Sequence, residues 1–239
     1  MKKHKKRIEL IDALRGLAVV LMVIHHLLYN LVYFLGAPVW LFTNPVFDVL
    51  HYMFAGLFIF LSGVSSRFSR GNIKRGFIVI AIAAGISAVT YYMEMPIWFG
   101  VLHLLGFSML FFGLTGKLWD KIPRTVAPVM FIAFIVAGAL ATSHASPSAE
   151  HSFLRICLSI LGWVQPGFRS FDYFPLLPWV FIFLLGTWAG VYIHERKLPA
   201  GFYEASFPFF PAVGRKALII YVLHQPVLYA LVMGIGRVI

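Results

Sequence analysis

The sequence predicts an all-α polytopic membrane protein, a bundle of about seven transmembrane helices plus one interfacial or re-entrant helix. Of its 239 residues, 60% are hydrophobic and 12% are charged, about half the charged fraction of an average soluble domain. The apolar residues occur in long blocks separated by short basic segments, a pattern typical of multi-pass membrane proteins. Helices are expected in these blocks because a helix satisfies each backbone polar group within its own segment.

The apolar blocks predict seven spans in chain order. Their approximate bounds are 8–34, 47–64, 77–92, 97–116, 126–141, 176–193 and 217–236. The first apolar run is too long for a signal peptide and is expected to be retained. A further apolar segment, 152–163, is too short for a span and is expected to form the interfacial or re-entrant helix. The chain is therefore expected to be a single transmembrane domain over residues 1–239.

The basic residues predict a plasma (inner) membrane protein with its N-terminus in the cytoplasm. In this orientation the positive-inside rule places most lysines and arginines of the connecting segments inside, leaving Arg155, Arg169 and Arg237 outside. If 152–163 crossed the membrane, the basic segment 194–216 would move outside, against the rule. The net charge of +11 therefore indicates contact with membrane lipid, and no nucleic acid is expected as a partner.

The segment "DALRGLAVVLMVIHH" carries ionisable residues into the first span. At about 100° and 1.5 Å per residue, Arg15 and His26 share one helix face about 16 Å apart. Asp12 lies on the same face, whereas His25 points about 100° away. Ionisable groups inside a membrane are costly and are commonly functional. The alternative is an Asp12–Arg15 ion pair that reaches toward the membrane surface, with His26 hydrogen-bonded inside the bundle.

Further polar residues lie toward the outer half of other spans. Asp48 is three residues before His51, so its carboxylate can orient that imidazole. His103 lies near the outer end of the fourth span, and His224 and Gln225 lie about midway along the last. Each histidine alone is typical of a hydrogen-bonded bundle residue, but together they predict a polar cavity open to the outside.

The inner ends of the spans carry basic residues beside glycine and serine. "LSGVSSRFSRGNIKR" contains Arg67, Arg70 and Lys74, and "GRK" contains Arg215. Small residues permit close backbone approach, and the guanidinium fork of arginine suits phosphate. The pattern predicts a polyanionic ligand on the cytoplasmic side, with Arg15 near its entrance. Positive-inside charge alone is the alternative explanation.

Four segments resemble the heparan-alpha-glucosaminide N-acetyltransferase catalytic-domain family in its bacterial members. They are "RIELIDALRGLAVVLMVIHH", "FIFLSGVSSRFSR", "DYFPLLPW" and "GRKALIIYVLHQPV". The resemblance covers most of the chain, although the middle spans match only in hydropathy. The first two segments are also remotely similar to the acyltransferase-three membrane family, in which an Asp-x-x-Arg precedes a histidine and an Arg-x-x-Arg follows a Ser-Gly element. On that pattern the functional histidine is His26, and the arginine pair is Arg67 and Arg70.

The resemblance implies a membrane-embedded acyltransferase that moves an acyl group, usually acetyl, from cytoplasmic acyl-coenzyme A to an amino sugar or other envelope glycan on the outer side. The catalytic candidates are His26, His51 and Asp48. The candidates for binding acyl-coenzyme A are Asp12, Arg15, Arg67, Arg70, Lys74 and Arg215. The candidates for binding the acceptor are His103, His224, Gln225 and Asp172, the first residue of "DYFPLLPW". The heparan enzymes have Asn at the position of His26 and a histidine further along, so the base is either His26 or His51.

Two other function classes are compatible with intramembrane histidines. A proton-coupled small-molecule transporter would use His and Asp groups as a proton relay, but it needs no basic inner site. A haem protein would use histidines of facing helices as ligands. For an acyltransferase that uses acyl-coenzyme A, neither a metal ion nor haem is expected as a cofactor. The single cysteine, Cys157, also argues against a thiolate metal site. Direct transfer and an acyl-histidine intermediate both stay open, as does the oligomeric state, for which a homodimer is one option.

Overall fold

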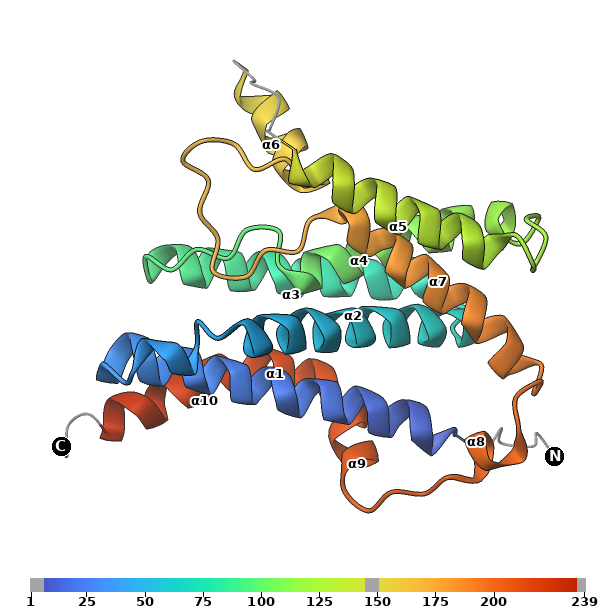
Figure 1. Cartoon of the computed structure of the whole chain (residues 1–239), viewed down its shortest axis with the longest axis horizontal. Helices are drawn as coiled ribbons and strands as arrows, with labels where there is room; N and C mark the ends of the chain where they lie inside the picture. The colour runs from blue at the N-terminus through green and yellow to red at the C-terminus, as the bar shows by residue number, and fades with distance from the viewer. Residues whose placement is uncertain (1–6, 145–150, 236–239) are drawn as a thin grey trace. The chain divides into compact units, whose positions relative to one another are not determined.

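The computed structural model describes residues 7–144 and 151–235 (Figure 1). Within these residues the secondary structure is helical and contains no strand. The chain divides into two compact parts, Met1–Phe58 with Leu198–Ile239, and Ile59–Lys197. Each part is described by itself. Arg237 and the end of the predicted last span lie outside the described residues.

The helices follow the predicted apolar blocks. The first part contains α1 (Glu9–Leu35), the 3-10 turn η1 (Val39–Leu41), the beginning of α2 (Pro45–Phe68), α8 (Ala200–Glu204), α9 (Phe210–Arg215) and α10 (Ala217–Ile235). The second part contains the rest of α2, α3 (Asn72–Tyr92), α4 (Val101–Trp119), α5 (Ala127–Ser143), α6 (Ser152–Leu161) and α7 (Leu176–His194). In the second part, Figure 1 shows α3 beside α4 and α5 beside α7.

The prediction of an all-α, multi-pass membrane protein is confirmed. Six segments of the described chain are long and apolar enough to cross a membrane, namely Glu9–Leu35, Val39–Phe68, Asn72–Tyr92, Val101–Trp119, Leu176–His194 and Ala217–Ile235. The predicted span at 126–141 is the helix α5, whose 17 residues reach the lower limit for spanning a bilayer. The segment predicted to be interfacial or re-entrant contains α6, which has 10 residues and is too short to cross.

Two helices are longer than predicted, because they include basic residues that were expected to lie beyond the ends of the spans. The second span was expected to end at residue 64, but α2 continues to Phe68 and includes Arg67. Similarly, α3 begins at Asn72 rather than at residue 77. Hydropathy falls at the first basic residues, whereas the backbone stays helical because long basic side chains reach the membrane surface from the last turn. The fourth span begins later than expected, at Val101, because the chain bends at Phe99, which has a φ of 55°.

In the first part, glycines allow α1 and α9 to cross at backbone contact. A side-chain methyl at Gly16 would overlap the carbonyl oxygen of Phe210, and one at Gly214 would overlap the carbonyl oxygen of Asp12. Gly214 is the glycine of the "GRK" segment, so its role in this contact is to bring α9 against the N-terminal end of α1. Small residues commonly make such crossings in membranes, where packing rather than water drives helix association.

The same device joins α2 to α7 in the second part. A methyl group at Gly63 would overlap the carbonyl oxygen of Phe183, and one at Gly186 would overlap the carbonyl oxygen of Phe60. Gly186 and Gly190 form a small-xxx-small pattern on α7, which is typical of closely packed membrane helices. The glycine in "LSGVSS" is therefore explained by helix packing.

Replacing Gly63 with alanine is expected to lower the thermal unfolding temperature in detergent. The methyl group forces α2 and α7 apart, and overpacking of this kind costs roughly 1–3 kcal/mol. Gly85→Ala on α3 is the matched control, because nothing lies within 4 Å of its added methyl and alanine favours a helix by about 0.5–1 kcal/mol. Equal unfolding temperatures for the two variants would contradict the close crossing.

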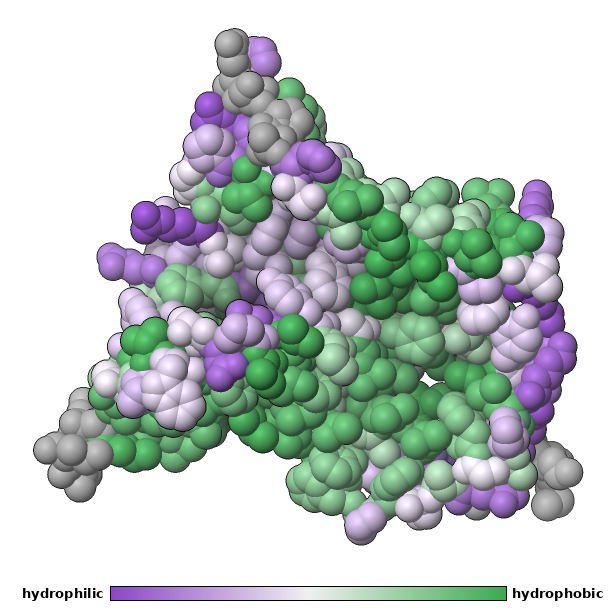
Figure 2. Space-filling view, in the orientation of Figure 1, coloured by the Kyte–Doolittle hydropathy of each residue, from purple (hydrophilic) through white to green (hydrophobic). Residues whose placement is uncertain are grey.

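Hydrophobic side chains cover the helices of the second part where lipid is expected. On α5 the exposed large hydrophobic residues are Val129, Ile132, Phe134, Val136 and Leu140, and Figure 2 shows a hydrophobic surface along α5. Hydrophilic residues gather at the connection between α4 and α5. The apolar surface is thus a lipid-facing one, with the polar connection at its end.

Candidate functional site

Four histidines of the first part form one cluster. The rings of His25 and His51 are stacked with centroids 4.3 Å apart. His26 lies edge-on to His25 at 5.8 Å and to His224 at 4.8 Å. The structure thus brings together three predicted residues, His26, His51 and His224, and adds His25, which the helical-wheel argument placed on another face. His25 is the member that links His26 to His51.

Backbone hydrogen bonds define the proton positions on two of these rings. His26 Nδ1 lies 2.9 Å from the carbonyl oxygen of Met22, and His224 Nδ1 lies 2.6 Å from that of Tyr221. A carbonyl oxygen only accepts, so each neutral ring carries its proton on Nδ1. The basic lone pair of both His26 and His224 is therefore on Nε2.

A buried amide pair lies next to the His26–His224 contact. Asn30 Nδ2 donates to Gln225 Oε1 over 3.2 Å, and Asn30 is 2% exposed. The bond joins α1 to α10 one residue after His224 and about one turn after His26. Gln225 was predicted as an acceptor-binding residue, whereas here its amide oxygen binds Asn30. Sequence reasoning missed Asn30, although a lone buried amide in an apolar span is itself a signal.

Two other predicted residues of α1, Asp12 and Arg15, form an ion pair with each other. Asp12 Oδ1 pairs with Arg15 Nη1 at 2.9 Å, which is the ion pair considered as the alternative for the first span. Asp48 is exposed at the beginning of α2. Since the ring of His51 lies against His25 and Tyr52, orientation of His51 by Asp48 stays a prediction.

His103 and Asp172 belong to the second part and lie near the beginning of α4. The hydroxyl of Ser87 donates to the carbonyl oxygen of Ile97 over 2.5 Å, so it accepts from His103 Nε2, 3.3 Å away. Asp172 Oδ2 accepts the backbone N–H of Val101 at 3.2 Å. The carboxylate therefore caps the N-terminus of α4, a position where the helix dipole favours negative charge.

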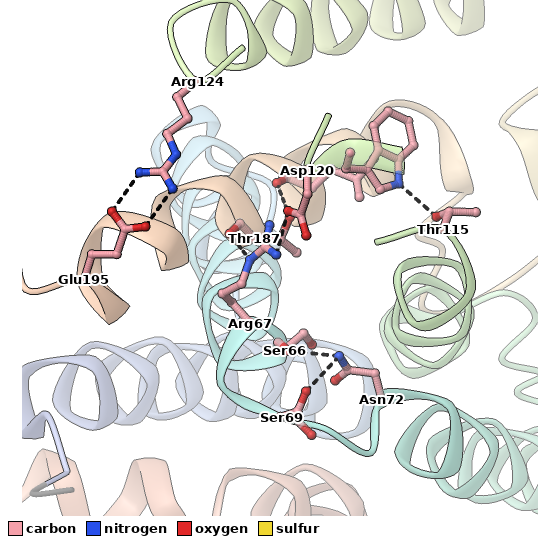
Figure 3. Close-up of polar contacts among 11 residues, drawn as sticks. Ser66, Arg67, Ser69, Asn72, Thr115, Asp120, Arg124, Thr187 and Glu195 are labelled. Carbon is pink, nitrogen blue, oxygen red and sulfur yellow. Dashed lines mark hydrogen bonds and ion pairs between the residues drawn. The ribbon is translucent and has the colours of Figure 1, made fainter. Parts of the chain in front are cut away.

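Among Arg67, Arg70, Lys74 and Arg215, the basic residues predicted to bind the donor, Arg67 makes the most contacts that fix its side chain (Figure 3). Its Nη1 pairs with Asp120 Oδ1 at 2.8 Å, and its Nε donates to the carbonyl oxygen of Thr187 over 3.1 Å. The guanidinium also lies 5.1 Å above the centre of the Phe112 ring, a cation–π arrangement. Residues of α2, α4 and α7 thus hold one guanidinium in place. Asp120, which follows α4, was missed because its partner is distant in sequence.

Arg67 lines a pocket of about 280 Å³ at the ends of α2, α4 and α7 and the beginning of α5. The charged residues of the lining are Arg67, Asp120, Arg124 and Glu195, and the ring-bearing residues are Trp119, Phe131, Trp188 and His194. Arg124 forms a bidentate ion pair with Glu195 at 2.7 and 2.6 Å. Arg124, followed by Lys197, lowers the pKa of Glu195 to about 2, so this carboxylate is ionised at neutral pH.

The remaining predicted basic residues are exposed. Arg70 and Lys74 lie at the turn from α2 to α3, where Asn72 Nδ2 donates to the carbonyl oxygen of Ser66 over 2.8 Å (Figure 3). Arg215 is exposed at the end of α9 in the first part. Ser66 itself donates to the carbonyl of its own helix, at Ser62, over 3.0 Å, so this serine serves the helix rather than a ligand.

Within residues 7–144 and 151–235, no group of three or more His, Cys, Asp or Glu residues is arranged to hold a metal ion. This includes the histidine cluster, whose rings contact one another by stacking and edges. His26 and His224 are two neighbouring rings, and each has a ring nitrogen, Nε2, that can accept a proton. Such a pair suits general-base chemistry.

A family model described as heparan-alpha-glucosaminide N-acetyltransferase, catalytic, matches residues 7–226. The matched region includes the histidine cluster, the arginine pocket and nearly all of the described helices. No curated protein and no solved structure matches the chain. Since the match extends over most of the sequence, the chain belongs to the heparan-alpha-glucosaminide N-acetyltransferase catalytic-domain family, a family of membrane N-acetyltransferases that use acetyl-coenzyme A.

Proposed function

We propose that this protein transfers an acetyl group from cytoplasmic acetyl-coenzyme A to an amino sugar or other envelope glycan on the outer side of the plasma membrane. Family membership supports acetyl transfer. The observation that carries the proposal is His26, a residue of a membrane-spanning helix whose ring lies edge-on to that of His224 and whose lone pair is on Nε2. The whole chain acts as one catalytic domain.

His26 Nε2 is the proposed general base. It takes a proton from the acceptor amine as the nitrogen attacks the thioester carbon, and the C–S bond then breaks. The leaving thiolate takes up the proton, so atoms and charges balance and the base is regenerated. The second ring, His224, lies 4.8 Å away between centroids and can share the proton during the step. An acetyl-histidine intermediate would use the same Nε2 lone pair.

His103 and Asp172 are proposed to bind the acceptor at the beginning of α4. The carboxylate of Asp172 accepts the backbone N–H of Val101 through Oδ2, and an amino sugar offers hydroxyl donors to a carboxylate at this position. The donor is proposed to bind at the opposite ends of the helices of the second part, through the basic side chains of Arg67, Arg70 and Lys74. Arg215 of the first part stays a separate candidate for donor binding. The positive-inside rule supports this orientation, with the donor in the cytoplasm.

Acetyl transfer across vesicles tests the proposal. Purified protein in lipid vesicles receives radiolabelled acetyl-coenzyme A inside and glucosamine outside, and maleimide labelling of Cys157, the single cysteine, sorts the vesicles by orientation. The expected result is labelled N-acetylglucosamine outside, produced only in vesicles whose Cys157 faces outward. Uptake of a solute without consumption of acetyl-coenzyme A would instead favour the transporter.

A further inference from the structure

The two arginines of the pocket are held by carboxylates in different ways. Arg124 donates from Nη1 and Nη2 to the two carboxylate oxygens of Glu195, at 2.7 and 2.6 Å. Arg67 is paired with a single oxygen of Asp120 at 2.8 Å. A guanidinium has five N–H donors in a planar fork and binds a bidentate anion best. The contact with Asp120 therefore uses only part of the binding capacity of Arg67.

The two members of the Arg67–Asp120 pair also differ in exposure. The side chain of Arg67 is 19% exposed, whereas that of Asp120 is 51% exposed. Arg67 has two further supports, the carbonyl of Thr187 and the face of Phe112, which do not depend on Asp120. Asp120 can thus rotate into water while the guanidinium stays in place, and ion pairs with so exposed a partner are weak.

We propose that this pocket binds the phosphorylated nucleotide end of the donor, and that Asp120 holds Arg67 until a donor phosphate displaces it. The inference rests on the proposed function, because it identifies which end of coenzyme A this pocket accepts. A phosphate carries more charge and more acceptor oxygens than one carboxylate, so it competes well for the fork of Arg67. Asp120 would thereby make the pocket selective, because an anion that binds Arg67 weakly does not displace the Asp120 carboxylate from it.

The size and lining of the pocket suit a nucleotide. Its volume of about 280 Å³ is just below the roughly 300–1,000 Å³ of pockets for drug-sized ligands, so it accommodates one end of coenzyme A and not the whole molecule. Trp119 and Trp188 supply aromatic rings beside the arginines. Aromatic faces stack on nucleobases while arginines bind phosphate, and the pocket combines both groups.

The competing explanation is that Asp120 is a structural partner that orients Arg67 for the ligand or joins α2 to α4. The two explanations predict opposite signs. If the donor displaces Asp120, then Asp120→Asn removes a competitor and strengthens binding. If Asp120 orients Arg67, the same substitution weakens binding, because the guanidinium loses its position.

The change in affinity is measured by calorimetry in detergent with adenosine 3′,5′-bisphosphate, the nucleotide end of coenzyme A. Asp120→Asn is expected to bind the bisphosphate more tightly by up to about fivefold, the factor that corresponds to a partly exposed ion pair. Binding of pantetheine, which lacks the nucleotide, is expected to stay unchanged. Glu204→Gln is the control for net charge, because Glu204 is an exposed carboxylate on α8, and its affinity is expected to equal that of the wild type.

Weaker or unchanged bisphosphate binding in Asp120→Asn overturns the displacement, as does an equal gain in Glu204→Gln. Asp120→Ala serves as a second variant, since it removes the carboxylate without leaving an amide to bind Arg67. Acetyl transfer across vesicles is measured in parallel for each protein. If the wild type transfers acetyl groups but Asp120→Asn binds the bisphosphate with unchanged affinity, only this inference fails. If the wild type does not transfer acetyl groups, the proposed function itself fails.

Discussion

Replacement of His26 by alanine is expected to lower acetyl transfer by about 10²-fold or more, the range for loss of a general base. The Nδ1 proton of His26 is held by Met22, so the lone pair that remains for chemistry is on Nε2. Alanine removes that lone pair and leaves His224 without its neighbouring ring. Acetyl-coenzyme A binding is expected to be retained, because the proposed phosphate contacts lie elsewhere. Acetyl-coenzyme A consumption with glucosamine measures the loss, and a thermal-shift assay checks folding.

His25→Ala is the matched comparison, one residue away on the same helix. His25 stacks on His51 and lies against Phe42, so its loss is expected to act through packing and to reduce transfer much less. His51→Ala tests the other candidate base, and a loss as large as that of His26→Ala would mean that both imidazoles act together. An inactive His25→Ala beside an active His26→Ala would refute the assignment of the base.

Reversal of charge at Arg67 is expected to weaken acetyl-coenzyme A binding more than tenfold. Loss of one hydrogen bond to a charged group costs roughly 1.5–3 kcal/mol, which corresponds to about 10- to 150-fold in affinity. Arg67→Glu also places a second carboxylate beside Asp120, so the pocket becomes repulsive to phosphate. Calorimetry of donor binding in detergent measures the change.

Arg70→Glu is the comparison for this prediction, because it makes the same charge reversal three residues along the chain. Arg70 is exposed, and exposed charges are screened by salt, so the loss is expected to be smaller. Arg67→Lys retains the charge but removes the planar fork, and an intermediate loss is expected. Equal affinities for the wild type and both glutamate variants would reduce this basic cluster to a signal of membrane orientation.

Much of the fold could be predicted from the sequence because a membrane restricts what a chain can do. A long apolar block must satisfy its backbone polar groups internally, so it forms a helix wherever it lies. The blocks at α1, α3 and α10 were thus predictable as helices. The ends of the helices were harder to predict. Hydropathy falls at residues such as Arg67, whereas the helical hydrogen bonds of the backbone continue past them.

The candidate site was predictable only in part, and for a related reason. The sequence by itself determined that Asp12, Arg15 and His26 share a face of α1, because that relation depends on helix geometry alone. Only the tertiary structure decided that His25 stacks on His51, that Asn30 binds Gln225, and that Asp120 holds Arg67. These partners are separated by 26 or more positions in the sequence, so side-chain packing between helices, rather than periodicity within one, brings them into contact.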